Sequence, residues 1–501
     1  MRRRTFLRTG AAAALATALP HRRALAAAYR PLTQVPPDLD AVTGDGGEVV
    51  LRGRDVQALS QSLRGSVLLA DDEGYDSARR VLNPSFDKYP ALVVQPTGAA
   101  DVQRTVEFAA AHDLLTAVKC GGHSFSGKST CDRGLLIDLS TFRGVRVDRA
   151  TRRGRIAGGS LLGELDHESM AHGLVTPMGT VSHTGVGGLA TGGGFGRLAR
   201  RYGLSLDNMT TVDVVAADGK LYQASAEENE DLFWAVRGGG GNFGVVTSFE
   251  FQLHPMQRDV VGGAILYPLS MMRDVLERYR EYHERAPDEL YMDFLGIQAP
   301  GGDPPVTGFS VCYSGPENQA EAVLAPLRSL GDPLVDTVAR MDYVAQQRSG
   351  DIDDPRAQGQ YLTGGFIAEL PDGLIDGLVD GFKGDPRRAT VVFFQHSGGA
   401  INRIPNEATA FPHRYAMANV GINTGWPFGA EADAHMDYAR QYWRSIQQYG
   451  DGFYTVDVPP DTTAEGINRN YRGNYDRLVT IKNRYDPGNL FRLNTNVEPR
   501  A

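Results

Sequence analysis

The spacing of apolar positions predicts short strands alternating with helices over the first half of the chain. Residues 92–94, 116–120 and 134–139 are apolar runs of strand length, whereas residues 100–112 place apolar side chains at helical spacing. Further elements are predicted at residues 145–156 (a hairpin), 161–172 (a helix ended by Gly173), 211–223 (a hairpin closed at Asp218-Gly219), 227–236 (a helix) and 245–253 (a strand). Pro255 then marks a boundary.

Beyond that boundary the pattern changes to longer helices. They are predicted at residues 271–285, 318–330 and 430–449, with strands between them such as residues 390–395. This pattern is typical of a second domain with an antiparallel sheet covered by helices. Residues 474–497 are rich in aromatic and basic side chains, which predicts an ordered C-terminal segment.

The N-terminal residues have the pattern of a twin-arginine export signal. Arg3 and Arg4 precede a small apolar stretch at residues 10–19, and residues 24–28 offer a small-residue cleavage site. The stretch is shorter than the roughly 20 residues that span a bilayer. We therefore expect residues 1–28 to be removed, with delivery to the periplasm or outside a bacterial cell and no membrane anchor afterwards. Residues 29–61, polar and interrupted by prolines, are expected to form an irregular arm.

Composition narrows the class of protein. A chain of 501 residues with 42% hydrophobic and 22% charged residues suits a globular protein of two domains or one large composite. Loss of residues 1–28 removes six arginines and no acidic residue, so the formal charge changes from −9 to −15. Such an acidic protein lacks the basic footprint that nucleic acid requires, and no zinc-ligand spacing is present. Cys120 and Cys131 could pair in an oxidising compartment, or be small buried residues.

The most informative motif is the turn Gly-Gly-His-Ser at residues 121–124, which follows a predicted strand. The backbone N–H groups of such a turn can point into one concavity and bind an anion. His123 would then be a nucleophile beside a phosphate or ring site, although a surface turn with an incidental histidine remains an alternative.

Two more glycine clusters follow. Residues 184–196 hold glycines interrupted by Val, Leu and Phe, unlike a polar Gly/Ser linker, and glycine permits positive φ and close approach to a ligand. Residues 239–244 formally match G-x-G-x-x-G, but a helix is predicted before them and a strand after them. The dinucleotide-binding motif needs the opposite order, so a nicotinamide enzyme is disfavoured.

Taken together, these motifs closely resemble the berberine-bridge-enzyme-like branch of FAD-linked oxidases, within the vanillyl-alcohol-oxidase (PCMH-type) superfamily. The matching segments are residues 121–124, 184–196 with 201–204, 233–244, and 474–478 with 482, 485–487 and 489–492. The resemblance implies an α+β, two-lobed fold. Its FAD-binding domain would span residues 62–257 and be completed by residues 451–501, and residues 258–450 would form a substrate-binding domain whose helix-covered antiparallel sheet roofs the flavin.

The resemblance also implies a cofactor and its site. FAD would be bonded to His123 through the C8 methyl of the flavin. The implied FAD-binding residues are Lys119, Gly121, Gly122, His123, Ser124, Gly127, Val181, Ser182, Thr184, Gly187, Gly188, Thr191, Gly192, Gly193, Gly194, Phe195, Gly241, Asn242, Gly244, Val245, Val246 and Asn494. Many relatives attach the flavin a second time through a cysteine, but Val181 stands at that position and cannot form a thioether. A single covalent link is therefore expected. Thr184 occupies the position of a residue that gates oxygen in relatives, and its valine-like shape favours oxygen as electron acceptor.

The catalytic groups are less clear from the sequence. Relatives carry a Tyr-x-Asn-Tyr (or His) strand, and here Tyr454 matches its first residue while Asp457 stands where the base would be. Asp457 would be a base if burial raised its pKa, or a solvent-exposed carboxylate at a strand end, which is the commoner situation. Asn419 and Asn423 share one face of a predicted roof strand and are candidates to contact substrate. Gln395 and His396 form a third candidate pair, although a lone histidine is more often structural.

Three functions of different classes follow. The first is a flavin-linked oxidase that transfers hydride from a C–H of an alcohol, sugar or secondary metabolite to FAD, with oxygen reduced to hydrogen peroxide. The second is a flavin-dependent dehydrogenase or cyclase with a non-oxygen acceptor. The third is a flavin-carrying binding protein, supported only by the altered Tyr-x-Asn-Tyr segment. The sequence names neither the substrate nor the oligomeric state.

Overall fold

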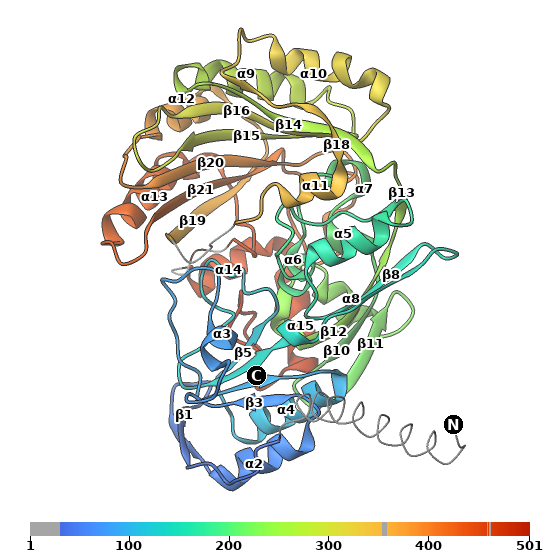
Figure 1. Ribbon diagram of the computed structural model, residues 1–501, viewed down its shortest axis with the longest axis vertical. Helices are drawn as coiled ribbons and strands as arrows, with labels where there is room; N and C mark the ends of the chain where they lie inside the picture. The colour runs from blue at the N-terminus through green and yellow to red at the C-terminus, as the bar shows by residue number, and fades with distance from the viewer. Residues whose placement is uncertain (1–30, 353–357, 458, 460–461, 501) are drawn as a thin grey trace, which may run out of the picture.

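The computed structural model describes residues 31–352, 358–457, 459 and 462–500, and it has two lobes, one above the other in Figure 1. The lower lobe is built mainly from residues before β14 (Asp259–Pro268), and the upper lobe from β14 to α13 (Asp433–Ile446). The mixture of helices with antiparallel sheets confirms the expected α+β architecture. The expected export signal, residues 1–28, lies outside the described residues.

The first sheet of the lower lobe carries the strand that leads into the histidine turn. Its strands, in spatial order, are β3 (Ser66–Leu68), β4 (Leu92–Gln95), β6 (Leu135–Asp138) and β5 (Thr116–Lys119), and the last three are parallel. Helices α2 (Gly53–Ser62) and α4 (Ala99–Ala111) pack on one face, and α3 (Tyr75–Arg79) packs on the other. The apolar runs predicted as strands at residues 92–94, 116–120 and 134–139 are confirmed.

Much of the expected irregular arm at residues 29–61 is regular structure instead. Strands β1 (Leu39–Val42) and β2 (Glu48–Leu51) form an antiparallel pair, and α2 follows directly. Ala41, Leu51 and Val56 are fully buried in the core of the first sheet. The apolar positions of this segment are sparse, so its order depends on contacts with residues much later in the chain.

A second, antiparallel sheet completes the lower lobe. Its strands, in spatial order, are β11 (Leu221–Ser225), β10 (Met209–Val215), β12 (Val245–Gln252), β8 (Arg153–Ala157) and β7 (Val145–Asp148). The surrounding helices include α5 (Leu162–Met170), α6 (Val186–Gly192), α7 (Ala199–Tyr202) and α8 (Glu230–Val236), while β9 (Leu174–Val175) and β13 (His254–Pro255) form a separate pair. The predicted hairpins and the strand at residues 245–253 are confirmed.

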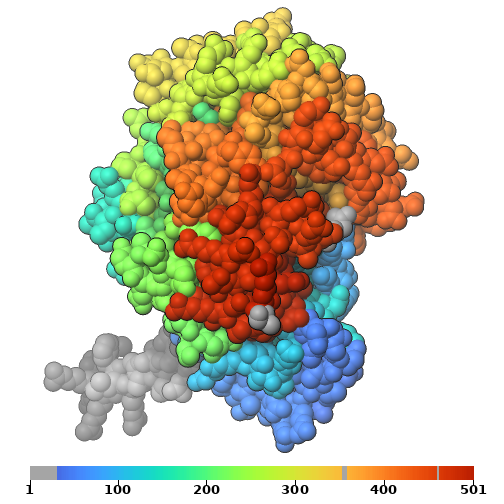
Figure 2. Space-filling model, turned by 180° about the vertical axis from the view of Figure 1, so that it is seen from behind, coloured from blue at the N-terminus to red at the C-terminus, as the bar shows by residue number. Residues whose placement is uncertain are grey.

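The C-terminal segment returns to this lobe, as expected. Helices α14 (Ala464–Asn470) and α15 (Tyr475–Tyr485) follow the upper lobe in sequence but lie beside the lower one (Figure 1). The Lys482 ammonium is fully buried, where it contacts Asp486 and donates to the Asn242 carbonyl at 2.8 Å. Seen from behind, the segment forms a red surface patch that reaches from the upper lobe to the lower one (Figure 2). It therefore closes the lower lobe and cannot be a frayed tail.

The upper lobe is a single large sheet with helices on its outer face. Among the described residues its main path runs β17 (Val335–Asp336), β14, β16 (Val306–Tyr313), β15 (Leu290–Gln298), β20 (Ala389–His396), β21 (Ala418–Pro427) and β19 (Gln358–Ile367), and β18 (Ala339–Asp342) also pairs with β14. Helices α9 (Met272–His283), α10 (Ala320–Arg328), α12 (Asp372–Gly381) and α13 cover the outer face, and α11 (Tyr343–Arg348) lies on the side of the lower lobe (Figure 1). The predicted antiparallel sheet with covering helices is confirmed.

The alternation of side chains defines which face of this sheet meets the lower lobe. Phe394 and Val420 point into the core beneath the outer helices. Phe366 points the other way and packs against Phe195 and Tyr454 of the lower lobe. Because Asn419 lies directly opposite Phe366 in the β19–β21 pairing, it shares that inner face. No helix among the described residues has the length and apolar character needed to cross a membrane.

Candidate active site

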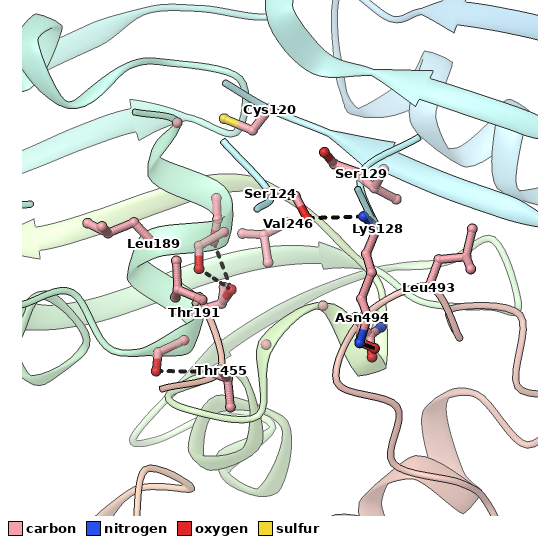
Figure 3. Close-up of a pocket in the computed structure, with 18 of the residues that line it drawn as sticks. Cys120, Ser124, Lys128, Ser129, Leu189, Thr191, Val246, Thr455, Leu493 and Asn494 are labelled. Atoms are coloured by element: carbon pink, nitrogen blue, oxygen red, sulfur yellow. Dashed lines mark hydrogen bonds between the residues drawn. The ribbon is translucent and has the colours of Figure 1, made fainter. Parts of the chain in front are cut away.

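A cavity of about 230 Å³ lies in the lower lobe where the glycine-rich turns meet (Figure 3). Its walls come from the end of β5 and the turn after it, the start of α6, the turn before β12, and two C-terminal stretches. The predicted FAD-binding residues that line it are Gly121, Gly122, His123, Ser124, Thr184, Gly187, Gly188, Thr191, Gly192, Gly241, Gly244, Val245, Val246 and Asn494. The fold thus brings all three glycine clusters of the sequence to one place.

The glycines of the cavity wall serve two purposes: some let two backbone segments touch, and others leave space in the cavity. A Cβ added at Gly121 would collide with the backbone of Gly185, and one added at Gly185 would collide with Gly121. The two turns therefore touch backbone to backbone. By contrast, a Cβ at Gly188, Gly240 or Gly241 would meet nothing within 4 Å, so at these positions the missing side chain leaves room in the cavity wall.

The polar groups of the lining suit the expected cofactor. Lys128 crosses the wall and donates from its ammonium to the Asn494 carbonyl at 2.9 Å, and the two residues lie side by side in Figure 3. Burial lowers the pKa of Lys128. Within the described residues, the side-chain oxygens of Asn494 and Ser129 are buried without a hydrogen-bond partner. A cation and unsatisfied polar atoms in a glycine-walled cavity fit a ligand that carries both an anionic group and hydroxyl groups, as FAD does.

Lys119, in contrast, does not line the cavity. Its neighbour Val118 does, and successive side chains of a strand point to opposite faces. The Lys119 ammonium therefore points to the other side of β5, where it contacts the Ala78 carbonyl and lies 3.4 Å from a carboxylate oxygen of Asp138. The lysine that reaches the cavity is Lys128, at the end of the same turn, and the motifs of the sequence did not predict this role for it.

Other predicted residues support the cavity from outside its lining. Gly193 and Gly194 have positive φ (156° and 91°), and the Gly194 N–H donates to the Tyr454 hydroxyl at 2.8 Å. Phe195 packs edge-on against Tyr454. Gly127 has φ 64°. The backbone N–H of Ser182, next to Val181, donates to Asp351 at 2.7 Å.

Asn242 acts as a link rather than as part of the cavity lining. Its side-chain amide donates to the carbonyls of Gly239 at 2.7 Å and Thr495 at 2.9 Å, and its side-chain oxygen accepts from the Val497 N–H at 2.8 Å. The side chain is fully buried. It therefore joins the C-terminal stretch that carries Asn494 to the turn before β12.

His123 stands in the cavity wall in a form suited to nucleophilic attack. Burial, together with the neighbouring His183, lowers the pKa of His123 to about 4, so its imidazole is neutral at ordinary pH. Its Nε2 lies 2.6 Å from Nδ1 of His183, and its Nδ1 lies 3.4 Å from the hydroxyl of Thr184. A neutral imidazole keeps a lone pair, which a protonated one lacks.

Tyr454 and Asp457 lie next to the cavity in a turn, not in the expected strand. Thr455 and Val456 between them line the cavity. Asp457 is half-buried rather than at a solvent-exposed strand end, and this burial raises its pKa to about 7. Burial raises the pKa of Tyr454 well above its ordinary value, so its hydroxyl stays neutral. A carboxyl group that titrates near neutrality is poised to exchange protons.

The roof sheet contributes a row of polar side chains on its inner face. Asn419 donates from its side-chain amide to the Gln395 side-chain oxygen at 2.8 Å, across the β20–β21 pairing. Asp293 of β15 follows in the same row, and burial raises its pKa to about 7. Asn423 shares this face, with its side-chain oxygen buried and unpartnered within the described residues. Asp293 was not predicted, because nothing near it in sequence marks it.

His396 lies on the opposite face, in contact with the outer helices. Its Nδ1 accepts from the Met292 N–H at 3.1 Å and its Nε2 lies 3.0 Å from Nδ1 of His283. Since Gln395 faces inward, strand alternation directs His396 outward. The pair expected to act together is therefore divided between the two faces.

The described residues contain neither a disulfide bond nor a cluster of metal-ligating side chains. Cys120 and Cys131 are free thiols, as is Cys312, so the disulfide alternative is not realised. Burial raises the pKa of the Cys120 thiol to about 11 and keeps it protonated. Among the described residues no group of histidine, cysteine and acidic side chains has the arrangement of a metal site.

Comparison with known protein families locates two matches in the chain. Residues 90–225 match the FAD binding domain, and residues 465–498 match the berberine and berberine-like segment. The first match contains the histidine turn and the second glycine cluster, and the second match covers α15.

Individual relatives match over almost their whole length. An FAD-linked oxidoreductase of Dictyostelium discoideum is 31% identical over 449 residues, which cover 89% of this chain and 97% of the relative. The (R)-6-hydroxynicotine oxidase of Paenarthrobacter nicotinovorans is 30% identical over 456 residues, 88% of this chain and 98% of that enzyme. The crystal structure of 6-hydroxy-D-nicotine oxidase from Arthrobacter nicotinovorans superposes with a TM-score of 0.80 at 28% identity, covering 88% of this chain and 99% of that one.

Proposed function

Because the chain belongs to the berberine-bridge-enzyme-like family of FAD-linked oxidoreductases, we propose that it is an oxidase whose FAD is covalently held by His123. Its reaction is hydride transfer from a C–H of an alcohol, sugar or secondary metabolite, with oxygen reduced to hydrogen peroxide. The observation that carries the proposal is the neutral imidazole of His123 in the wall of a glycine-lined cavity.

The bound flavin supplies the hydride acceptor, and the side chains supply binding and proton transfer. Lys128 offers a positive charge to the diphosphate, while Asn494 and Ser129 offer their unsatisfied oxygens to polar groups of the cofactor. Thr184, which lies next to His123, stands at the oxygen-gating position of relatives, and its valine-like shape supports oxygen as the electron acceptor. One covalent link is proposed, because Val181 offers no second nucleophile.

Substrate would lie between the cavity and the inner face of the roof sheet. Asn419 and Gln395 provide hydrogen-bond donors and acceptors there. Asp457, half-buried beside the cavity and with its pKa raised to about 7, is the proposed base that removes an O–H or N–H proton as hydride leaves the adjacent carbon. Tyr454, whose hydroxyl accepts from Gly194, orients the turn that carries Asp457.

The covalent claim is tested by acid precipitation of protein produced with ample riboflavin. The washed pellet of the wild type should stay yellow, and a peptide containing residue 123 should carry the mass of FAD. His123→Ala should lose the acid-stable colour while keeping some dissociable flavin. Wild-type flavin that washes away would overturn the covalent link but not the family assignment.

The oxidase claim is tested separately, with alcohols, sugars and secondary metabolites screened under oxygen for peroxide release. A hit is then used to reduce the flavin without oxygen before air is admitted. Reoxidation within seconds with stoichiometric peroxide supports an oxidase. Reoxidation over many minutes would instead identify a dehydrogenase or cyclase with another acceptor.

Export through the twin-arginine route completes the proposal. It rests on Arg3 and Arg4 and on the short apolar stretch after them. This route carries folded proteins, which suits an enzyme that takes up FAD before export. The expected result is periplasmic or extracellular enzyme in a bacterial host, and replacement of both arginines by lysine should leave it in the cytoplasm. Export that survives this change would count against the route.

A further inference from the structure

Among the described residues, His183 is the histidine that lies against His123. It lies just after Ser182 at the start of the second glycine cluster, 60 positions from His123 in sequence. The Nδ1 of His183 is 2.6 Å from Nε2 of His123, and the two rings are 4.6 Å apart between centroids and tilted by 44°. The contact is thus a hydrogen bond between two tilted imidazoles rather than a stacking contact.

A third group fixes the direction of this hydrogen bond. The backbone N–H of Ile352 donates to Nε2 of His183 at 3.1 Å. A backbone N–H can only donate, so Nε2 of His183 must carry a lone pair. The His183 proton is therefore on Nδ1, and it is donated to Nε2 of His123.

The upper lobe holds His183 in this orientation. We call residues 347–352, which end α11 and follow it, the latch. Asp351 of the latch accepts from the backbone N–H of Ser182 at 2.7 Å and from its hydroxyl at 2.5 Å. Gln347 donates from its side-chain amide to the Gly179 carbonyl at 2.9 Å. The segment that leads into His183 is thus anchored at Gly179 and at Ser182, which limits the freedom of the imidazole to turn away from His123.

We propose that His183 is a positioning residue for flavin attachment, which directs the bond to Nδ1 of His123. The inference rests on the proposed covalent function. Nε2 of His123 is occupied by the His183 proton, so attack from that atom would require His183 to leave. Nδ1, on the side of Thr184, which lines the cavity, is the remaining nitrogen; it carries the ring proton of neutral His123 and must lose that proton as the new bond forms.

The atoms and electrons of the attachment balance with oxygen as the oxidant. Nδ1 of His123 forms one C–N bond to the C8-methyl carbon of the flavin, while one N–H bond and one methyl C–H bond break. The two protons and two electrons released reduce one molecule of oxygen to hydrogen peroxide. In the product Nδ1 is alkylated and Nε2 still carries a lone pair, so the hydrogen bond from His183 is retained unchanged. The observed contacts are those that the attached form requires.

Three substitutions of His183 separate positioning from simple packing. Asparagine places an amide N–H near the former Nδ1, glutamine places its amide near the former Nε2, and leucine retains bulk without either group. Each full-length variant is produced with ample riboflavin and purified. Acid-stable flavin, total flavin and thermal unfolding are measured, and the growth of acid-stable flavin is followed after FAD is added.

We expect His183→Asn to attach flavin within about threefold of the wild-type rate, and His183→Gln and His183→Leu to be at least about tenfold slower, because one aligned hydrogen bond is lost. All three should bind FAD noncovalently before attachment, as the wild type does. The aminoacyl flavin released by proteolysis of the wild type should be the Nδ1 isomer alone, and the slow variants should yield Nε2 isomer as well.

The outcomes distinguish this inference from the proposed function. Wild-type protein without acid-stable flavin would refute the covalent proposal itself. Wild-type protein with acid-stable flavin, together with a His183→Leu variant that attaches it equally fast and at the same atom, would overturn the role of His183. Equal rates for the asparagine and glutamine variants would also overturn it, since glutamine keeps only the contact with Ile352.

Discussion

Removal of the Asn242 side chain should loosen the C-terminal closure of the cavity. Asn242→Ala deletes three buried hydrogen bonds: two join the turn before β12 to Thr495 and Val497, and the third, to Gly239, lies within the turn. The carbonyls of Gly239 and Thr495 and the N–H of Val497 then lose these contacts in a site from which water is excluded, because the side chain they contact is fully buried. The substitution removes little side-chain volume, so its main effect is to leave buried polar groups without hydrogen-bond partners.

The magnitude follows from the number of bonds. At about 1 kcal/mol for each buried hydrogen bond, the free energy of unfolding of the lower lobe should fall by about 3 kcal/mol. The surface substitution Thr480→Ala, which removes one exposed hydrogen bond to Asp476, should cost at most about 0.5 kcal/mol. The two variants therefore differ by several-fold in expected effect, although both remove hydrogen bonds made by the same C-terminal segment.

Urea denaturation followed by flavin fluorescence measures both variants, since unfolding of the lower lobe exposes the flavin. The urea midpoint of Asn242→Ala should fall well below that of wild type, while the slope of the transition stays the same. A midpoint as high as that of Thr480→Ala would refute the reasoning. It would mean that the C-terminal segment is held by other contacts, such as those of Lys482.

Three more predictions concern the cavity and the buried carboxyl groups. In the His123→Ala background, Lys128→Met should weaken non-covalent FAD binding by about tenfold in a fluorescence titration, because a charge-assisted contact is worth about 1.5 kcal/mol. Lys128→Arg in the same background should retain most of the affinity. Equal affinity with lysine, methionine and arginine at position 128 would contradict the assignment. In the wild type, kcat/KM should fall about tenfold for each pH unit below about pH 7, because Asp457 must be deprotonated to act as a base. Asp457→Asn should abolish this pH dependence. A wild-type profile that stays flat down to pH 5 would exclude Asp457 as the base. Burial raises the pKa of Asp293 in the folded protein to about 7, so between about pH 4 and 7 the folded protein holds a proton that the unfolded chain has released. The free energy of unfolding therefore falls with rising pH in this window, by up to about 1.4 kcal/mol per pH unit. Asp293→Asn should remove this contribution from the slope of thermal stability against pH, and an unchanged slope would contradict the burial argument.

Local pattern was sufficient for most elements and for the glycine clusters. Strand and helix periodicity identified β4, α4, β12 and α13, because that signal is contained within a few consecutive residues. The segment at residues 39–62 was missed, since its few apolar side chains are buried by contacts distant in sequence. The glycine-rich turns that meet at the cavity were recognised because glycine marks backbone positions where no other residue fits, as at Gly121, and their assignment to FAD came from the family resemblance.

The direction of individual side chains was decided by the tertiary structure. Strand alternation turned Lys119 away from the cavity, and a lysine nine positions later, Lys128, reaches it instead. Asp457 matched a family position, but only packing could determine whether it is buried enough to titrate near neutrality. Asp293 joins the inner row of the roof sheet through strand pairing that no short motif records.

The sequence alone displayed three glycine-rich turns and a histidine, and the resemblance of these motifs to FAD-linked oxidases predicted a flavin site in a two-lobed protein. Glycine spacing and apolar periodicity are local properties, so one chain without relatives displays them. Only the tertiary structure brought His183 to His123 across 60 positions, and Ile352 to His183 across 169. The direction of a proton between two imidazoles depends on a third donor, and its position is set by the packing of one lobe against the other.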